Sequence, residues 1–350
     1  MVTVNTVGDG GGPARKPLRV AVVGCGAIAE SFYVPALARR QATTQFVLVD
    51  VNLARARELA RHLETVEVAD DYKKVVGSVD AAIVAVPHHL HVPIARAFLD
   101  SRAHVLCEKP IAEDPSDVTA LVQLARERGV TLGVNNTRRL MPSSLETKRL
   151  LEQGQIGTIR SITYLDGNEF AWPTASGFYF DSSLSSKGVL FDLGAHVLDL
   201  ICWWLGGKPT VVSSVNDSFG GSESVAALTL EKGECRCTVR ISRLGRLANT
   251  YTIVGDKGEI SGQVYDGSRL TTKKSGPSGS LVTTLRMEKA LMSDIADRLI
   301  GNLYDILGNG GVPLVPASEV GDSIQLLQEA YQQATRFSMP WYEIGRVGNE

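Results

Sequence analysis

Three ionisable side chains recur at helical spacing in one apolar stretch, residues 189–205. Asp192, His196 and Asp199 lie at positions i, i+4 and i+7, so they share one face of a helix. A histidine beside carboxylates can accept a proton from a substrate near neutral pH. The same residues also suit an ordinary ion pair on a surface helix, and the spacing alone leaves both open. A polar stripe this narrow, beside two tryptophans, favours a buried, concave site.

A glycine turn near the start of the chain suits a phosphate ligand. The apolar run Leu18–Val23 leads into Gly24-Cys-Gly-Ala-Ile-Ala29, and a helical pattern begins near Ile28. Gly24 permits a tight turn, Gly26 the close approach of a pyrophosphate, and Ala29 the packing of helix on strand. Backbone N–H groups and the positive helix end would then bind the pyrophosphate. The residues expected to contact a dinucleotide here are Gly24, Gly26, Ala27 and Ile28.

A carboxylate at the end of the next apolar run bears on which dinucleotide binds. Gln45–Val49 runs into Asp50, 26 residues after Gly24, and no arginine follows directly. A carboxylate there accepts hydrogen bonds from the adenosine ribose hydroxyls and repels the 2′-phosphate of NADP. The sequence therefore favours NAD as the cofactor. The alternative interpretation is a plain βαβ unit with a glycine turn and no nucleotide.

The elements that must position these groups alternate between strand-like and helix-like over residues 18–137. Such alternation predicts an α/β domain, with a doubly wound parallel sheet and helices on both of its faces. Ligands of such sheets lie outside the carboxyl ends of the strands. Besides the glycine turn, Pro87-His88 and Glu108-Lys109-Pro110 fall at such ends. From its place at a strand end, we expect the Lys109–Pro110 peptide bond to be cis.

The pattern changes after a helix expected at residues 143–153. Short strand-like segments with hairpin-type breaks predict an α+β domain with a large open, mainly antiparallel sheet, into which the helix at 189–205 is inserted. Ser275–Ser280 is interpreted as a flexible loop, and Ser318 as the cap of a final helix at about 319–337. The strand-like segments are 158–165, 210–216, 224–230, 234–242, 250–254, 259–264 and 269–272.

We therefore expect the chain to have three parts. Residues 1–16 form a disordered tail, and residues 17–137 form an NAD-binding Rossmann domain. Residues 138–350 form a substrate-binding and oligomerisation domain, whose final helix packs back on the first domain. Nothing obvious in the sequence covers one face of the second sheet. We therefore expect a homodimer or homotetramer formed through that face.

Composition excludes several classes of partner. The chain has 350 residues, of which 44% are hydrophobic and 21% charged, and a net charge of −2. This charge gives no reason to expect binding to nucleic acid or to an anionic membrane. No apolar run approaches the ~18–20 residues of a membrane span. The five cysteines lack the spacing of a zinc site, and we interpret them as reduced thiols of a cytoplasmic protein.

Six motifs together resemble one known family. They are Gly24-Cys-Gly-Ala-Ile-Ala29, Pro35-Ala-Leu37, Val86-Pro-His-His-Leu-His91, Glu108-Lys109-Pro110, Arg138-Arg139, and the stretch from Gly188 to Asp199 that contains Asp192-Leu-Gly-Ala-His196. Over Leu18 to Phe337 the chain resembles the Gfo/Idh/MocA oxidoreductases, the family of glucose–fructose oxidoreductase and inositol dehydrogenase. Its members place a Rossmann domain first and an open-sheet α+β domain second, which agrees with the order predicted above.

The resemblance implies roles for individual residues. In the sugar and cyclitol dehydrogenases of the family, the positions of Lys109, Asp192 and His196 are catalytic. Glu108 and His88 are expected near the nicotinamide ribose, although His88 stands where many members carry Asn. The expected cofactor site is Gly24, Gly26, Ala27, Ile28, Asp50, Val86, Pro87, His88, His91, Glu108 and Lys109. The expected substrate site is Lys109, Asn136, Arg138, Trp172, Asp192 and His196.

Several neighbouring residues allow more than one role. His88, His89 and His91 are close together, but no carboxylate or cysteine completes a metal site and the family reaction needs none, so we expect no metal. His91 is also suited to capping the start of its helix. The aromatic segments 170–172 and 177–180 suit a lid or a sugar platform, or else packing at a sheet edge. Asn136 and Arg138 suit either a hydroxyl or a phosphate.

The predicted function is NAD-dependent oxidation of a secondary hydroxyl to a ketone, on a sugar, aminosugar, sugar nucleotide or cyclitol. His196 accepts the hydroxyl proton and Lys109 stabilises the developing alkoxide. Keto-sugar reductases of the family often carry Tyr at the position of His196, which favours oxidation. The alternatives are reduction of a keto-sugar with NADH, a redox-neutral epimerase or glycosidase with retained NAD, and a non-catalytic NAD-binding regulator.

Overall fold

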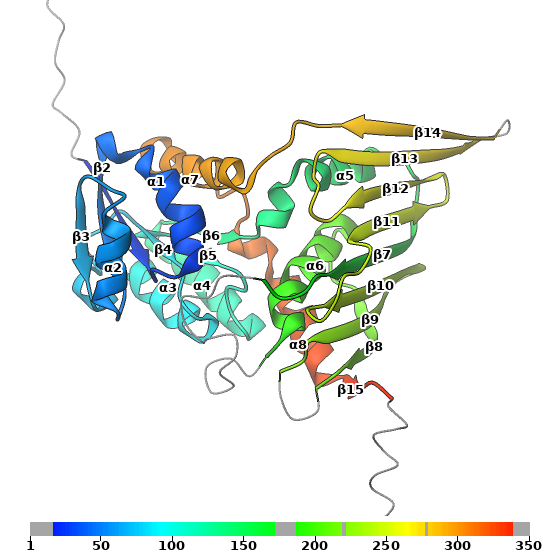
Figure 1. Cartoon of the computed structure of the whole chain (residues 1–350), viewed down its shortest axis with the longest axis horizontal. Coiled ribbons are helices and arrows are strands. Elements are labelled where there is room, and N and C mark those ends of the chain that lie inside the picture. Colours follow the sequence, from blue (N-terminus) through cyan, green and yellow to red (C-terminus); the bar gives the residue numbers. More distant parts are fainter. Residues whose placement is uncertain (1–16, 172–186, 219–221, 277–278, 339–350) are drawn as a thin grey trace, which may run out of the picture.

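Two β-sheets, each covered by helices, make up the body of the molecule (Figure 1). The computed structural model describes residues 17–171, 187–218, 222–276 and 279–338. The predicted tail at 1–16, Trp172 and the aromatic segment 177–180 lie outside the described residues. The first sheet is wholly parallel and the second is mixed but mainly antiparallel. The predicted fold class is therefore confirmed.

The first sheet has six strands in the order β3-β2-β1-β4-β5-β6. Strands β1, β2 and β4 are near-continuous runs of buried apolar residues, because helices cover both faces of the sheet, whereas the edge strand β3 is only half-buried. The strand order reverses between β1 and β4, which is the place where ligands bind in such sheets. The strands are β1 (Leu18–Val23), β2 (Thr44–Val49), β3 (Val66–Ala69), β4 (Ala81–Val84), β5 (His104–Glu108) and β6 (Leu132–Asn135).

Local signals start and stop the helices around this sheet. Asn52 Oδ1 accepts the N–H groups of Ala54 and Arg55 at 3.1 and 3.3 Å, and Asp114 caps α4, which ends at Gly129 with a φ of +69°. The helix predicted to begin near Ile28 is less regular, because Pro35 lacks the N–H group that a continuous α-helix would use. The segments are the π-helix η1 (Ala29–Tyr33), α1 (Val34–Ala38), α2 (Leu53–Ala60), α3 (His91–Asp100) and α4 (Pro115–Arg128).

The second sheet has nine strands in the order β14-β13-β12-β11-β7-β10-β9-β8-β15. Within the described ranges, its parallel pairs are β7 with β10 and β8 with β15. The interpretation of Ser275–Ser280 as a flexible loop is wrong, because its two ends pair with each other in the β13–β14 hairpin. The strands are β7 (Ile159–Gly167), β8 (Thr210–Asn216), β9 (Val225–Lys232), β10 (Cys235–Ser242), β11 (Thr250–Gly255), β12 (Gly258–Gln263), β13 (Arg269–Gly276), β14 (Gly279–Arg286) and β15 (Ala334–Arg336).

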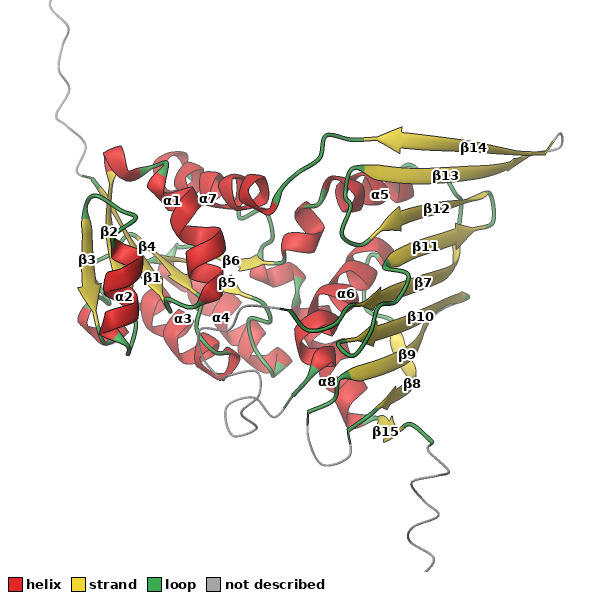
Figure 2. Cartoon of the chain, viewed as in Figure 1, coloured by secondary structure: helices red, strands yellow, loops and turns green. Residues whose placement is uncertain are grey.

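Helices cover one face of this sheet (Figure 2). They are α5 (Pro142–Glu152), α6 (Val189–Leu205) and α8 (Gly321–Gln332). Ile162 and Tyr164 of β7 face these helices and are buried, whereas Thr163 between them points the other way and is exposed. Among the described residues no helix lies over that second side, which we call the open face.

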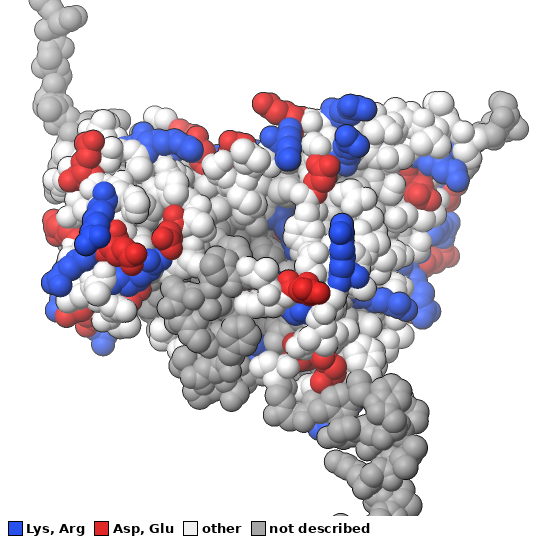
Figure 3. All heavy atoms as spheres, viewed as in Figure 1, with Lys and Arg blue, Asp and Glu red and all other residues white. Residues whose placement is uncertain are grey.

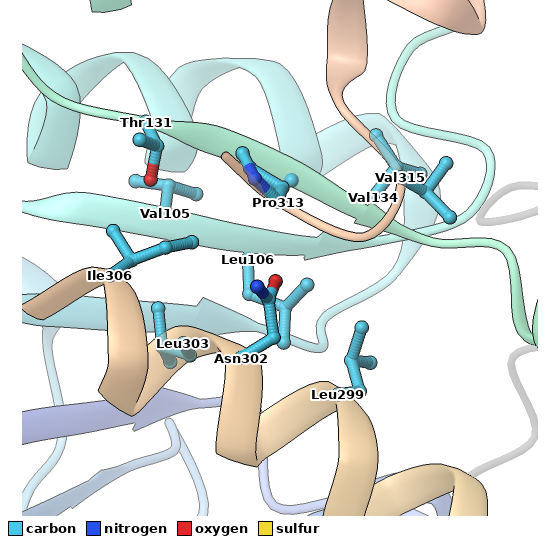
Figure 4. A pocket seen from close by; sticks show the side chains of 11 residues that line it. Val105, Leu106, Thr131, Val134, Leu299, Asn302, Leu303, Ile306, Pro313 and Val315 are labelled. Atoms are coloured by element: carbon cyan, nitrogen blue, oxygen red, sulfur yellow. The ribbon is translucent and has the colours of Figure 1, made fainter. Parts of the chain in front are cut away.

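Helix α7 (Met292–Asn309) has no counterpart among the predicted elements, and it packs on the first sheet rather than the second. Figure 4 shows Leu299, Leu303 and Ile306 of α7 facing Val105 and Leu106 of β5. These apolar side chains line a small void in the core together with Thr131 and Asn302, whose side chains are already hydrogen-bonded to His104 and to the backbone of Val312 and Leu314. The chain therefore returns to the N-terminal core well after residue 138, where the second domain is predicted to begin.

The final helix also differs from its prediction. Val320, not Ser318, is the N-cap of α8, because Ser318 lies in a separate 3₁₀ turn at Ala317–Glu319. The helix stops at Gln332, and the next residues form β15 instead of extending it to 337. Helix α8 packs chiefly on α6 and β8 and also touches α4, so it joins the two halves of the molecule.

Candidate active site

A lysine from the first domain meets an aspartate from the second. Lys109 follows β5, after which the Lys109–Pro110 peptide bond is cis, as expected. Asp192 lies in the first turn of α6. Lys109 Nζ donates to Asp192 Oδ1 at 2.7 Å and to the Asp192 carbonyl oxygen at 3.0 Å. Both side chains are largely buried, so the polar face of α6 begins at the junction of the two domains.

An arginine that the sequence analysis did not single out completes this contact. Arg243, just after β10, donates from Nη2 to the other carboxylate oxygen, Asp192 Oδ2. Its guanidinium carbon lies 5.2 Å from the centre of the Phe170 ring. Burial by itself would raise the pKa of the Asp192 carboxyl, but Lys109 and Arg243 together hold it well below its usual value. Arg243 belongs to none of the motifs that the sequence analysis used. The residues around it in the chain therefore gave no signal of this role.

His196 lies one turn further along α6 and is neutral at physiological pH. Burial lowers its pKa well below 6.5, and the positive charges of Lys109 and Arg138 lower it further. Its Nδ1 atom is buried and, within the described part of the chain, has no hydrogen-bond partner. A neutral imidazole with an open ring nitrogen can accept a proton from a bound molecule.

Asp199, the third member of the predicted stripe, serves another purpose. Its two oxygens accept from Nε and Nη2 of Arg139, each at 2.7 Å, and Arg139 also pairs with Glu319 at 2.8 Å. Asp199 and Arg139 are only 1% and 3% exposed. Seven residues correspond to about 10 Å along a helix axis, which places Asp199 two turns away from Asp192. It therefore holds α6 against the segment before α5 and against the turn before α8.

The start of α6 is held by a buried glutamate. Glu223, 4% exposed, precedes β9 and accepts through Oε1 the N–H groups of Gly188 and Leu190, at 3.1 and 3.0 Å. The same oxygen accepts from the Tyr331 hydroxyl at 2.6 Å. A carboxylate at this end complements the helix dipole and satisfies N–H groups that the helix leaves unpaired. Glu223 therefore fixes the position from which Asp192 and His196 extend.

Arg138, a predicted substrate residue, already has internal partners. It forms an ion pair with the fully buried Asp166 at 2.6 Å and donates to the Tyr164 hydroxyl at 3.2 Å. Tyr265 donates to Asp166 at 2.6 Å, and its ring lies over the guanidinium of Arg138 at 5.7 Å. Because Asp166 neutralises Arg138, a substrate phosphate is not needed to balance this charge. Asn136 is 4% exposed, and its buried Oδ1 has no partner among the described residues.

The glycine turn has the shape that a dinucleotide requires. Gly24 adopts a φ of +97°, and a Cβ atom there would lie 2.3 Å from the Ala85 carbonyl oxygen. At Gly26 an added Cβ would have open space, with nothing within 4 Å. Asp50 accepts the Cys25 N–H at 2.8 Å through Oδ2 and the Asn52 N–H at 2.8 Å through Oδ1. A carboxylate has about four acceptor positions, so Asp50 can still accept bonds from a ribose.

Of the residues predicted at the nicotinamide end, His91 has a structural role. It is fully buried, and its ring nitrogens lie 2.8 Å from the carbonyl oxygens of Val86 and Pro110. It therefore links the loops after β4 and β5, and its side chain does not cap α3 as expected. Glu108 accepts from Tyr33 and Asn135, each at 2.7 Å.

Whether the described residues hold another kind of site depends on the packing of His88, on possible metal ligands, on the apolarity of the helices and on surface charge. The His88 ring packs against Phe191 at 5.1 Å, and burial lowers its pKa well below 6.5. Within the described residues, no three His, Cys, Asp or Glu side chains cluster as metal ligands would. In the same part of the chain, no helix combines the length and apolarity needed to cross a membrane. Acidic and basic side chains are interspersed on the face drawn in Figure 3.

Comparison with known families and proteins matches both halves of the chain. Residues 18–136 match the oxidoreductase family with an NAD-binding Rossmann fold, and residues 144–261 match the GFO/IDH/MocA C-terminal domain. A levoglucosan dehydrogenase of Pseudarthrobacter phenanthrenivorans is 26% identical over 72% of this chain and 69% of its own length. A D-glucoside 3-dehydrogenase of Escherichia coli and an inositol 2-dehydrogenase of Saccharopolyspora erythraea are 30% and 32% identical; each match covers 57% of both chains.

Solved structures share the fold over nearly the whole chain. A levoglucosan dehydrogenase in complex with NADH and levoglucosan gives a TM-score of 0.79 at 18% identity, covering 91% of this chain and 97% of that one. A 3-ketoreductase from Actinomadura kijaniata with NADP and TDP-benzene gives 0.77 at 20% identity, covering 93% and 100%. These TM-scores show that the overall fold is shared across both sheets of this chain. The chain therefore belongs to the Gfo/Idh/MocA family of oxidoreductases.

Proposed function

We propose that this protein oxidises a secondary hydroxyl of a sugar or cyclitol to a ketone, with NAD bound at the glycine turn. One observation carries the proposal: Lys109 Nζ contacts Asp192 on the same helix as a neutral His196 whose Nδ1 is open among the described residues. The relatives named as dehydrogenases of levoglucosan, D-glucosides and inositol support the substrate class. All three names point to compounds with secondary hydroxyls.

Each group then has a defined task. His196 accepts the hydroxyl proton, because it is neutral at working pH. The Lys109 ammonium stabilises the negative charge that develops on the substrate oxygen. Asp192 orients Lys109 and accepts a hydrogen bond from a neighbouring hydroxyl. Bound NAD supplies the hydride acceptor. Since His196 begins without a proton, the arrangement favours oxidation over reduction.

We propose NAD rather than NADP because of the charges around the adenosine end. Asp50 presents a carboxylate at the end of β2, which repels a 2′-phosphate. Arg55 donates from Nε to the Cys25 carbonyl oxygen at 2.9 Å and is close to that end, but Glu30 and Glu58 already pair with its guanidinium. Calorimetric titration is expected to give a lower dissociation constant for NAD than for NADP.

We also propose that a second copy packs on the open face. Thr163 lies in a row of hydroxyl side chains that crosses eight strands at directly paired positions. Such a flat row suits sheet-on-sheet packing between identical faces. The row is Thr284, Thr271, Ser261, Thr252, Thr163, Thr238, Thr229 and Ser213. Light scattering should give a dimer or tetramer, and Thr163→Arg should lower that mass.

The activity is tested with a panel of sugars, aminosugars, sugar nucleotides and inositols, with NAD as the acceptor. The appearance of reduced cofactor with one class supports the proposal. His196→Asn should then lower kcat by roughly 10²–10⁴-fold while NAD binding is unchanged. Turnover of keto-sugars with NADH alone would reverse the direction proposed. NAD binding without turnover in either direction would indicate a regulator.

A further inference from the structure

Among the described residues, the charged side chains around His196 do not balance. Positive charges come from Lys109, Arg138 and Arg243, and negative charges from Asp166 and Asp192. These five side chains are at most 23% exposed, and His196 is neutral. The group therefore carries one surplus positive charge. An unbalanced charge in a buried site is costly unless a ligand of opposite charge completes it.

Glu108, next to Lys109 in the chain, does not supply the missing charge on the substrate side. Its carboxylate accepts from the side chains of Tyr33 and Asn135, both within the first domain. That places it on the side where we expect the cofactor. The surplus therefore remains where α6 and the loop after β10 face each other.

Arg138 and Arg243 differ in how their donors are used. Arg138 has an ion pair with Asp166 and a hydrogen bond to Tyr164. Arg243 uses one Nη2 hydrogen for Asp192, and within the described residues its Nε and Nη1 have no hydrogen-bond partner. A guanidinium has five N–H donors in a planar fork, which matches the two oxygens of a carboxylate. The centre of the Phe170 ring lies under the guanidinium, 5.2 Å from its carbon, which favours the cation at this position.

We propose that the substrate carries a carboxylate, and that Arg243 binds it. The substrate class is then a sugar acid, such as a uronate, with the reacting hydroxyl at Lys109 and His196. This inference rests on the proposed function, because it concerns the same site. Lys109 and Arg243 contact the two oxygens of one carboxylate, so a single sugar ring can reach both cations. A carboxylate balances the one surplus charge, whereas the dianion of a phosphate monoester exceeds it.

The test compares binding of matched ligands to the full chain loaded with NAD. Isothermal titration is carried out with glucuronate, galacturonate and mannuronate, with the three parent hexoses, and with glucose 6-phosphate. At least one acid should bind about tenfold or more tightly than its parent hexose. Equal binding of each acid and its parent, absence of binding by every acid, or tighter binding of the phosphate would overturn the proposal.

Variants test which residue binds the carboxylate of the ligand. Arg243→Gln should remove the preference for the acid, and Arg243→Lys should keep part of it, because the charge remains but the fork is lost. Arg246→Gln is the matched control, since Arg246 is exposed on the same loop. If circular dichroism shows that Arg243→Gln is folded and the variant keeps the full preference for the acid over its parent hexose, Arg243 does not bind the carboxylate.

The two proposals fail in different ways. Sugar acids that bind through Arg243 without producing reduced cofactor would contradict the oxidation and leave the assignment of the ligand intact. Turnover of neutral sugars alone would support the oxidation and contradict the ligand. Where an acid is turned over, Arg243→Gln should raise its KM about tenfold more than it raises the KM of the parent hexose.

Discussion

Replacing Asp199 by Asn should destabilise the protein without impairing the chemistry. The change keeps the shape of the side chain but removes the charge that balances Arg139, which is 3% exposed. Removing one partner of a buried ion pair typically costs about 3–5 kcal/mol. Glu319 still pairs with Arg139 at 2.8 Å, but it is 51% exposed and replaces only part of the loss. We therefore expect a loss of about 3 kcal/mol.

That loss corresponds to a measurable shift in melting temperature. Unfolding entropy is about 2.1 cal/mol/K per residue, or about 0.7 kcal/mol/K for 350 residues. Dividing about 3 kcal/mol by this value gives a decrease in Tm of about 4 °C. Differential scanning calorimetry measures it, and kcat is measured well below the transition. The tryptophans of α6 also report the transition by fluorescence.

His196→Asn on the same helix is the matched comparison. His196 Nδ1 gives up no hydrogen bond within the described residues, so this variant should keep its Tm within about 2 °C and lose turnover. An Asp199→Asn protein with unchanged Tm would show that the buried pair does not stabilise the fold. Loss of kcat in the folded Asp199→Asn protein would show that Asp199 takes part in the chemistry. The assignment of Asp192 and His196 to catalysis and of Asp199 to stability alone would then be wrong.

Three further predictions concern acid stability, the glycine turn and the helix anchor. Burial lowers the pKa of His91 from 6.5 to about 4, so its contribution to stability is present above pH 6.5 and is lost as the pH falls. Urea unfolding should therefore show that His91 contributes about 2 kcal/mol less stability at pH 5 than at pH 8. His91→Asn should remove that difference. Gly24→Ala should lower Tm by several degrees, because its Cβ meets the Ala85 carbonyl, whereas Gly26→Ala should keep Tm and weaken NAD binding in calorimetric titration. Glu223→Gln should cost about 1–2 kcal/mol in urea unfolding, since α6 loses a charge at its N-terminus, and an unchanged midpoint would contradict that role.

The architecture of the first domain follows from local signals in the sequence. Strands buried on both faces need continuous apolar runs, and caps such as Asn52 and Asp114 act within a few residues of the chain. The glycine turn is also local, because Gly24 needs its backbone conformation wherever it lies in space. These features were predictable because each depends on neighbours in sequence.

Strand β14 was missed for the opposite reason, whereas α7 was missed although it carries a local signal. One side of α7 is buried against β5 and against the helical segment η1–α1, all of which lie far earlier in the chain. Strand β14 lies at the edge of its sheet and keeps Leu281 and Val282 exposed. Strand β14 has no pattern that separates it from loop, so the partner on which it packs decided its structure. In α7, by contrast, Ile295, Leu299, Leu303 and Ile306 recur at helical spacing, which is the pattern of an amphipathic helix.

The sequence by itself determined the family, the dinucleotide turn and a helix with three ionisable residues on one face. Only the tertiary structure decided that Asp192 meets Lys109 while Asp199 meets Arg139. It also decided that Arg243 joins Asp192 and that Arg138 is neutralised by Asp166. Helical periodicity fixes which side chains share a face, but their partners come from other elements. Those partners depend on how the two sheets pack, and spacing along the chain does not encode that packing.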